Sequence, residues 1–354
     1  MKRLIADPKS LDAGRPERVV FYPTLAHLDP SGGDWHVSIR GAIHGPTVYD
    51  RRNAVLLRLL RRLLDVDASE LESDVFRERI RHFLSSSVGR RQVVVDLAAG
   101  QREVSLKSHR SGHFRGRLRI PSSEAGLMEQ SGHLADGWLN INVASCAGRM
   151  LPCGGSVKFL GRLGISIISD IDDTIKHTDV CHRRSLLHNT FLKKFEPVEG
   201  MATLYRRWAE HGVDFHYVSS SPWQLYNALE ELCRREGFPR GTFHLRSVRF
   251  RDPSIVKLLI RYRRGKRRTI RALVRMFPQR RFVLVGDSGE ADPEIYGWIA
   301  RWYPQQVARI LIRDVSTRPM TPHRRERAFG KLPRCKWQVF VEPGELGPEH
   351  PWAD

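Results

Sequence analysis

Hydrophobic and polar positions alternate differently in the two halves of this 354-residue chain. In the first half, short runs rich in β-branched and aromatic residues are separated by turn residues, a pattern typical of an antiparallel β-sandwich. The runs cover Arg18–Leu28, Trp35–Ile43, Gln92–Leu97, Glu103–Lys107, Phe114–Ile120 and Trp138–Val143. We therefore predict a β-rich, sandwich-like domain over residues 1–156.

One segment of this first half, near residues 50–86, has a helical period instead. Apolar residues recur there at helical spacing and are interrupted by arginines, namely Val55, Leu56, Leu59, Leu60 and Leu63 with Arg58, Arg61 and Arg62. This pattern predicts a basic amphipathic helix inserted into the β-rich domain. Such a helix either packs on the protein with its basic face in water or docks on a membrane surface, and the sequence leaves both open.

The second half alternates strand-like and helix-like segments, which predicts an α/β domain with a parallel sheet over residues 157–345 and a short tail over 346–354. Apolar stripes at i, i+3, i+4 and i+7 begin at Met201, Leu225, Ile270 and Ile295. Glycine or proline follows each stripe, at Gly212, Gly237, Pro278 and Pro304. The strand-like runs are Ile165–Ile168, Val213–Ser219, Phe282–Gly286, Val307–Ile312 and Trp337–Val341.

The net charge of the chain says more about its binding partners than its content of hydrophobic residues does. Hydrophobic residues make up 41%, enough for folded domains, and 59 Lys and Arg against 39 Asp and Glu give a net charge of +20. This excess fits a nucleic-acid, acidic-lipid or phosphorylated partner, and it equally fits general arginine usage on the surface. Charge alone does not choose among polyanions.

Cysteine usage and hydropathy indicate a cytoplasmic protein. The five cysteines are scattered without a C-x-x-C pair, which argues against a disulfide framework and a cysteine zinc site. The first residues contain too short an apolar run for a signal peptide, and no stretch approaches the roughly 20 apolar residues of a membrane span. We expect no transmembrane segment, and any membrane contact to be peripheral, on the inner face.

Carboxylates follow directly after the first strand of the predicted parallel sheet. Asp170 and Asp172 come after Ile165–Ile168, at the sheet edge where open α/β sheets bind ligands. Extended backbone would direct both side chains to the same side, where their repulsion calls for a divalent cation. A calcium loop of the EF-hand type is excluded, because the positions that need Gly and Glu hold Ile175 and Cys181.

Further polar residues follow the other predicted strands at the same edge. Ser219 and Ser220 end one strand, as a cap or as donors to a phosphoryl oxygen, and Ser221 with Pro222 is expected to cap the helix that follows. Asp287 and Asp292 lie in a glycine-containing loop after another strand. Lys266 begins a helix among the arginines Arg261, Arg263, Arg264, Arg267 and Arg268, any of which could supply the cation. Together these residues predict a metal-dependent phosphoryl-transfer site.

The motifs around these residues resemble a known family. Asp170-x-Asp172-x-Thr174, the strand-end serine, the lysine and the Asp287–Asp292 loop resemble the four motifs of the haloacid dehalogenase superfamily. The segments Ser169–Lys176, Phe215–Tyr226 and Phe282–Tyr296 resemble the catalytic domain of the actin-patch-type phosphatidate phosphatases and their bacterial relatives. The resemblance covers about Val157–Val315, with weaker matches in the first half. It implies a Rossmann-like parallel sheet with a small cap.

The resemblance also implies roles for the site residues. Asp170 would be the nucleophile that forms an aspartyl-phosphate, and Asp172 would be the general acid and base. Thr174 and Ser219 would hold phosphoryl oxygens, with Ser220 nearby, and Lys266 would balance charge and bind substrate.

The cofactor implied by the resemblance is Mg²⁺. Asp170, the main-chain carbonyl of Asp172 and Asp287 would bind the ion, and Asp292 would orient its ligand shell.

Three functions remain open from the sequence. The first is a Mg²⁺-dependent lipid phosphatase acting on phosphatidate at a membrane, since the short cap segment, residues 177–197, would leave the site open to a substrate on a surface. The second is a phosphatase for nucleic-acid ends or phosphoproteins, and the third is a non-catalytic binding module. Three histidines in the cap, His177, His182 and His188, have spacings that fit no common zinc site.

Overall fold

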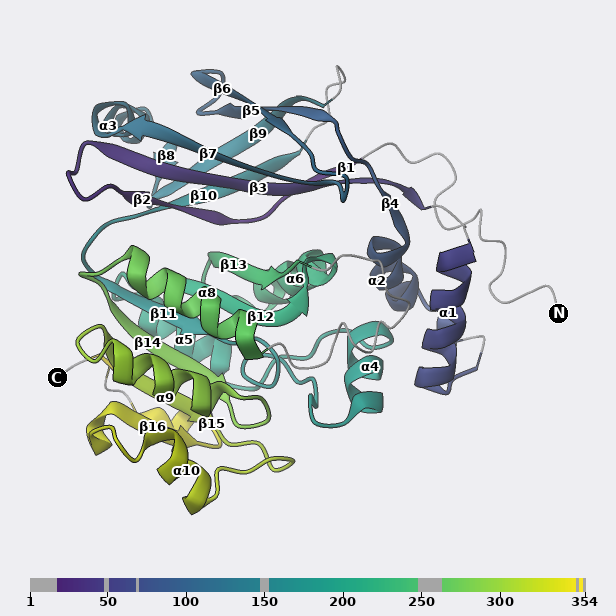
Figure 1. Cartoon of the computed structure of the whole chain (residues 1–354), viewed down its shortest axis with the longest axis vertical. Helices are drawn as coiled ribbons and strands as arrows, with labels where there is room; N and C mark the ends of the chain where they lie inside the picture. Colours follow the sequence, from purple (N-terminus) through teal and green to yellow (C-terminus); the bar gives the residue numbers. More distant parts are fainter. Residues whose placement is uncertain are drawn as a thin grey trace. The chain divides into compact units, whose positions relative to one another are not determined.

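The chain forms two compact units, Met1–Asn53 with Arg81–Arg162, and Ala54–Ile80 with Leu163–Asp354 (Figure 1). The computed structural model describes residues 18–47, 51–67, 70–146, 153–247, 263–347 and 350–352. Of the arginines near Lys266, Arg261 lies outside the described residues, as do the side chains of Arg263 and Arg264.

The first unit is built on a sheet of ten strands. Their order is β1-β3-β2-β10-β9-β5-β6, while β4 and β7 pair with β3 and β8 pairs with β9. The strands are β1 (Arg18–Phe21), β2 (Thr24–Leu28), β3 (Asp34–Thr47), β4 (Ser85–Ser87), β5 (Gln92–Leu97), β6 (Arg102–Lys107), β7 (His113–Pro121), β8 (Leu134–Ala135), β9 (Trp138–Cys146) and β10 (Gly154–Leu160), with helix α3 (Ser122–Gln130) after β7. The predicted β-rich character is confirmed, and these strands pair in antiparallel fashion except for β2 with β10.

Alternation of buried and exposed residues explains how these strands form a core. In β5, Val93, Val95 and Leu97 are fully buried while the residues between them are partly exposed. Because successive side chains of a strand point to opposite faces, one face of β5 packs into the apolar core of this unit. The same alternation that predicted the strand therefore also decides which of its residues are buried.

The second unit contains a parallel sheet of six strands in the order β13-β12-β11-β14-β15-β16, which confirms the predicted parallel α/β architecture. The strands are β11 (Ile165–Ser169), β12 (Asp214–Pro222), β13 (Gly241–Arg246), β14 (Arg281–Asp287), β15 (Val307–Arg313) and β16 (Trp337–Phe340). The main helices are α4 (Arg183–Phe191), α5 (Met201–Ala209), α6 (Tyr226–Glu236), α8 (Arg263–Met276), α9 (Asp292–Trp302) and α10 (Pro322–Phe329).

The strand order reverses direction between β11 and β14. From β11 the chain proceeds to β12 and β13 on one side, then returns to β14, β15 and β16 on the other. Because parallel crossovers are right-handed, this places α5 and α6 on one face and α8 and α9 on the opposite face, as Figure 1 shows. A ligand site is expected where the direction reverses, at the carboxyl ends of β11 and β14.

The predicted helical insertion forms α1 (Arg51–Leu64) and α2 (Asp74–Leu84), but most of it, residues 54–80, belongs to the second compact unit and not to the first. Contacts with the cap segment explain this. His188 Nε2 lies 2.8 Å from the Leu64 carbonyl oxygen, and the Arg79 guanidinium lies 3.6 Å from the centre of the Phe195 ring. In α1, Leu60 and Leu64 are fully buried while Arg58 is exposed, so the helix packs on the protein with a basic face in solvent.

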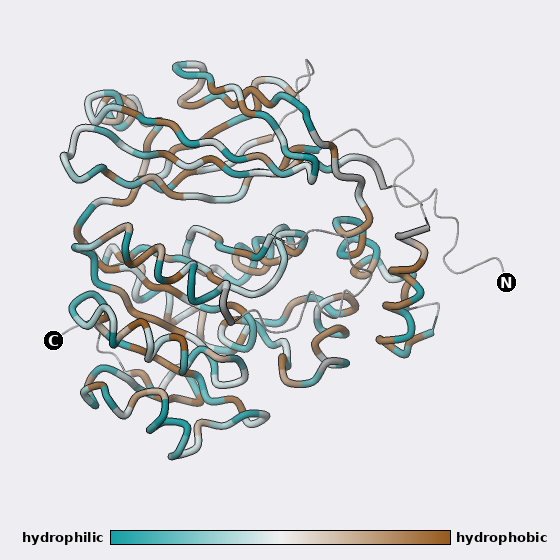
Figure 2. The backbone as a smooth tube through the Cα atoms, in the orientation of Figure 1, coloured by the Kyte–Doolittle hydropathy of each residue, from teal (hydrophilic) through white to brown (hydrophobic). Residues whose placement is uncertain are grey.

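Hydrophobic residues concentrate in the central strands and in stripes along the helices, as Figure 2 shows. In the part of the chain that the structure describes, no helix has both the length and the apolar character needed to cross a bilayer.

Candidate active site

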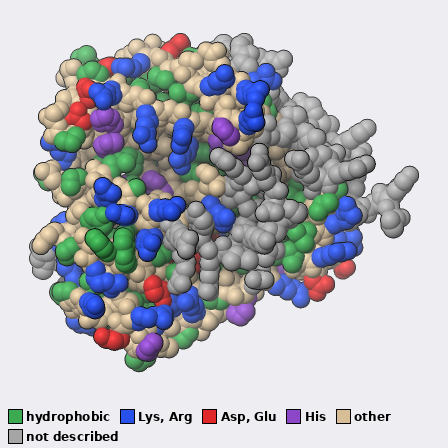
Figure 3. All heavy atoms as spheres, viewed as in Figure 1, with side chains coloured by type: hydrophobic (Ala, Val, Ile, Leu, Met, Phe, Trp, Pro, Cys, Tyr) green, Lys and Arg blue, Asp and Glu red, His purple; other side chains and the backbone are tan. Residues whose placement is uncertain are grey.

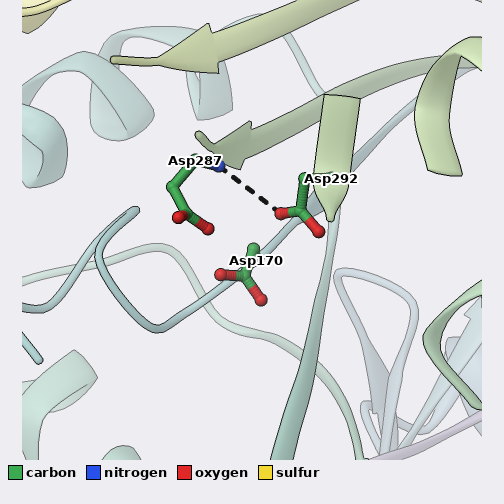
Figure 4. Close-up of side chains that lie close together, drawn as sticks. All are labelled: Asp170, Asp287 and Asp292. Carbon is green, nitrogen blue, oxygen red and sulfur yellow. Dashed lines mark hydrogen bonds between the residues drawn. The ribbon is translucent and has the colours of Figure 1, made fainter. Parts of the chain in front are cut away.

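Three aspartates from two neighbouring strands and one helix point toward each other at the reversal of strand order (Figure 4). Asp170 follows β11, Asp287 ends β14 and Asp292 begins α9. One carboxylate oxygen of each lies within 4.8 Å of the others, and the three side chains are buried. The apolar strands that hold them explain the burial, because Ile167, Ile168 and Val285 are inaccessible to solvent. We call these three residues the aspartate cluster.

Among the described residues, Lys266 is the cation that contacts this cluster. Its Nζ lies 2.7 Å from Asp170 Oδ1 and 2.5 Å from Asp292 Oδ1, and the side chain is almost fully buried. Glu290, which was not predicted from the sequence, lies 3.4 Å from the same Nζ. Its position in the loop between Asp287 and Asp292 was the signal that could have identified it. The lysine among the arginines thus lies where the sequence placed it.

Burial disfavours the negatively charged form of the carboxyl groups in this cluster. Burial raises the pKa of Asp287 well above its usual value, and the charges of Asp292 and Glu290 raise it further. Burial also raises the pKa of Asp170, against the opposing effect of Lys266. In the part of the chain that the structure describes, one lysine therefore faces four carboxyl groups, and another cation would relieve their repulsion.

The donor set fits Mg²⁺, which prefers carboxylate oxygens. Asp287 Oδ2 is buried and has no hydrogen-bond partner within the described residues. Two glycines near the cluster also allow its carboxylates to come close to the backbone. A Cβ atom on Gly286 would clash with Asp292 Oδ2, and one on Gly289 would lie 2.8 Å from Asp287 Oδ1. The cluster thus has a buried oxygen without a partner among the described residues, and two glycines where a Cβ would crowd its carboxylates.

Asp172 lies outside the aspartate cluster and is held by a second set of partners. Its Oδ1 accepts from Lys176 Nζ at 2.8 Å and from Thr178 Oγ1 at 2.9 Å, and its Oδ2 accepts from Ser219 Oγ at 2.8 Å and Ser221 Oγ at 2.9 Å. Burial raises the pKa of Asp172, but Lys176 and these hydrogen bonds outweigh it and lower the pKa to about 2. The side chain is therefore a stable carboxylate in this geometry.

Ser219 was predicted from the sequence as a site residue, whereas Ser221 was predicted only as a helix cap, which it is not, and Lys176 and Thr178 were missed. Strand periodicity could have found Ser221, because residues two apart on β12 point to the same side, while Ser220 is partly exposed on the other. Lys176 is a basic residue four positions after Asp172, directly within the motif. Nothing in a single sequence distinguishes Thr178 from other threonines.

The remaining predicted residues have different surroundings. Thr174 Oγ1 lies 3.4 Å from Asp170 Oδ2, and Thr174 is fully buried. Asp173 has a positive φ of 56° and turns away from the cluster. Its carboxylate accepts hydrogen bonds from the backbone N–H groups of Thr178, Asp179 and Val180 at 2.7 to 2.8 Å. Asp173 therefore stabilises the loop that carries Thr178.

We expect Lys176→Met to destabilise the fold by about 3–5 kcal/mol, because it leaves Asp172 buried without its cation. The pKa of Asp172 lies below its ordinary value of 3.8, so its contribution to stability is present above about pH 4 and is lost as pH falls toward 2. The difference from wild type should shrink over that range. Urea unfolding measures it, with the exposed Lys194→Met as the control, expected within about 0.5 kcal/mol of wild type. Equal stability of both variants would contradict the role of Lys176.

The chain is similar to known proteins over this region. Residues 165–314 match the family described as "Phosphatidate phosphatase APP1, catalytic domain". Phosphatidate phosphatase APP1 of Saccharomyces cerevisiae is 32% identical over 258 residues, which are 69% of this chain and 41% of the yeast protein. An uncharacterized protein of Schizosaccharomyces pombe is 34% identical over 163 residues, 45% of this chain and 26% of that protein.

This chain therefore spans less than half the length of the curated relatives it matches. Among solved structures, a β-glucuronidase of Parabacteroides merdae aligns with 84% of this chain and 34% of its own, with 10% identity and a TM-score of 0.26, too low to indicate a shared fold. All the buried carboxylates described above, and Lys266, lie within the matched residues 165–314.

Proposed function

Residues 165–314 belong to the family of the phosphatidate phosphatase APP1 catalytic domain, and on this premise we propose that the protein is a phosphoric monoester hydrolase whose substrate is phosphatidate. The main support for this proposal is that Asp170, Lys266 and Asp287 lie close together at the carboxyl edge of the parallel sheet, inside the matched segment. A buried carboxylate beside a lysine is suited to attack on a phosphorus atom in a site that excludes bulk water.

In the proposed reaction, an oxygen of Asp170 attacks the phosphorus of phosphatidate. The bond between phosphorus and the glycerol oxygen breaks, and diacylglycerol leaves after its oxygen has gained a proton. The result is an aspartyl-phosphate on Asp170. Lys266, 2.7 Å from Asp170, favours the charged form of that carboxylate against the effect of burial and offsets the charge of the phosphoryl oxygens. Water then attacks phosphorus, phosphate leaves, and Asp170 is restored.

Asp172 is the proposed proton carrier for both steps. Its low pKa keeps it ionised, as the second step requires, in which it takes a proton from the attacking water. For the first step it must hold a proton. Ser219 and Ser221 now donate to Asp172, and they lie at the strand end where phosphoryl oxygens would need donors. If these hydroxyls turn to the substrate, Asp172 loses two hydrogen bonds beside a new negative charge, and both changes raise its pKa.

Mg²⁺ is the proposed cofactor, with Asp170 and Asp287 as its side-chain ligands and Asp292 beside them. When bound, the ion would supply positive charge against which the phosphoryl oxygens are polarised. Asp292 already accepts a hydrogen bond from Tyr296 and pairs with Lys266, so it is suited to orient its neighbours. Asp287 keeps one oxygen unpartnered among the described residues, which suits a direct ligand.

A phosphate-release panel tests the proposed function. We expect the full chain with Mg²⁺ to release phosphate from phosphatidate vesicles much faster than from an end-phosphorylated oligonucleotide or a phosphopeptide. Preferred turnover of the oligonucleotide or phosphopeptide would replace the lipid assignment. Absence of phosphate release from every substrate would contradict the proposal that the protein is a hydrolase.

A further inference from the structure

A polar pocket of about 350 Å³ lies beside helix α4 in the cap segment, residues 177–197. We call it the α4 pocket. All of its lining residues are polar or charged, namely Asp179, Arg184, Ser185, His188, Asn189 and Lys193. None of these residues belongs to the aspartate cluster or to the partners of Asp172. The chemistry of this pocket is therefore separate from that of the proposed active site.

Its free donors suit an anion. Within the described part of the chain, neither Ser185 Oγ nor Lys193 Nζ has a partner, and Lys193 is exposed. Arg184 pairs with Asp65 at 3.0 Å, but 61% of its side chain is accessible. The one acid of the lining, Asp179, contacts His182 Nδ1 at 2.8 Å. The pocket thus offers the Lys193 ammonium and the Ser185 hydroxyl to a ligand, while Arg184 is paired with Asp65 and Asp179 contacts His182.

The α4 pocket is connected to the proposed active site by two hydrogen bonds. Asn189 Nδ2 donates to the carbonyl oxygen of Thr178 at 3.0 Å, and Thr178 Oγ1 donates to Asp172 Oδ1 at 2.9 Å. A ligand in the pocket would therefore contact the loop that holds Asp172. A substrate and a second anion could be bound close together, as neighbouring molecules are in a lipid surface.

Helix α1 adds exposed basic side chains and one exposed apolar side chain next to the pocket. His188 and Arg184, both in the pocket lining, contact the carbonyl of Leu64 and the side chain of Asp65 at the end of this helix. The outer face of α1 carries exposed Val55 beside exposed Arg58. Figure 3 shows hydrophobic and basic side chains next to each other over this helix. An exposed apolar side chain beside a basic one is compatible with contact to a membrane interface.

These features favour a bilayer over a nucleic acid. Single-stranded nucleic acids bind grooves in which aromatic side chains stack on the bases, and the lining of the α4 pocket contains no Phe, Tyr or Trp. A polar pocket beside an exposed valine and basic side chains instead fits one lipid headgroup at a membrane surface.

We propose that the α4 pocket binds the phosphate-bearing headgroup of an anionic bilayer phospholipid and so docks the catalytic unit beside its substrate. The choice of a bilayer rests on the proposed function. Lys193 binds the headgroup phosphate, with Ser185 and Arg184 as further donors. The docking lipid is a phosphodiester and is not hydrolysed, because it does not enter the aspartate cluster.

Sedimentation with vesicles tests this proposal without turnover. The full chain is mixed with vesicles of phosphatidylcholine alone or with phosphatidylglycerol. We expect binding only with phosphatidylglycerol, and a loss of about tenfold or more in Lys193→Glu. Lys194→Glu is the matched control, since Lys194 is also exposed and makes the same charge change but does not line the pocket. Its loss should be less than about threefold, and thermal unfolding of both variants checks that they fold.

Equal losses of vesicle binding in the two variants would contradict the proposal and indicate diffuse electrostatic attraction instead. No loss of binding in either variant would also contradict it. Binding of an oligonucleotide that depends on Lys193, without binding to phosphatidylglycerol vesicles, would also overturn it. The outcome is independent of the phosphate-release panel. Vesicle binding that depends on Lys193, without hydrolysis of phosphatidate, would support the lipid site and contradict the proposed activity. Hydrolysis of phosphatidate without vesicle binding that depends on Lys193 would contradict the lipid site alone.

Discussion

Asp170→Asn is expected to lower phosphate release from phosphatidate below about 1% of the wild-type rate while leaving the fold intact. An amide cannot serve as the attacking carboxylate, so the aspartyl-phosphate cannot form. The change removes little volume from a fully buried position. It also removes one negative charge from a cluster in which burial and neighbouring carboxylates already raise the pKa of Asp170, so the fold should tolerate it.

Circular dichroism and phosphate release on the same sample separate loss of chemistry from loss of structure. Asp67→Asn is a matched control, because Asp67 is exposed and the substitution makes the same chemical change. It should keep wild-type activity. Activity of Asp170→Asn above about 1% of wild type would require a different nucleophile.

Removal of divalent cations by excess EDTA is expected to abolish turnover, and added Mg²⁺ should restore it. Asp287→Ala should cost more activity than Asp292→Ala. Asp287 Oδ2 has neither a hydrogen bond nor an ion pair among the described residues, whereas Asp292 Oδ1 forms an ion pair with Lys266 at 2.5 Å and Asp292 Oδ2 accepts a hydrogen bond from Tyr296 at 3.3 Å. Asp287→Ala thus removes an available metal ligand, whereas Asp292→Ala removes a carboxylate that already contacts Lys266 and Tyr296.

Thermal unfolding gives a readout of the same site that does not depend on activity. A ligand that binds only the folded chain raises its Tm, so Mg²⁺ should raise the Tm of the wild type and not that of Asp287→Ala. Full activity in EDTA, or an equal rise in Tm for the wild type and Asp287→Ala, would contradict the metal assignment.

Much of the second unit could be predicted from its sequence because each strand and helix has its own pattern of apolar and polar residues. Apolar strands that end in polar residues, and helices with a regular apolar stripe, identified β11, β12, β14 and β15 and the helices α5, α6, α8 and α9. Parallel strands share one carboxyl edge, so the sequence alone was enough to place Asp170 and Asp287 together.

Other features depend on contacts that a single sequence does not display. The segment 54–80 lies in the second unit because of contacts such as that between Leu64 and His188, more than a hundred positions apart. Strand β13 was missed because its neighbours, not its own short sequence, determine that it pairs with β12. Lys176 was overlooked as a partner of Asp172 because charged residues usually lie on the surface, and this one is buried.

The most direct test of the central claim is to find where the phosphoryl group is bound during turnover. The full chain is mixed with phosphatidate and Mg²⁺, quenched rapidly in acid and analysed by mass spectrometry of its peptides. We predict a phosphate on the peptide that contains Asp170, at that residue, and none in Asp170→Asn. Phosphate on another residue, or rapid turnover without any phosphorylated peptide, would contradict the claim that Asp170 is the nucleophile of a phosphatase.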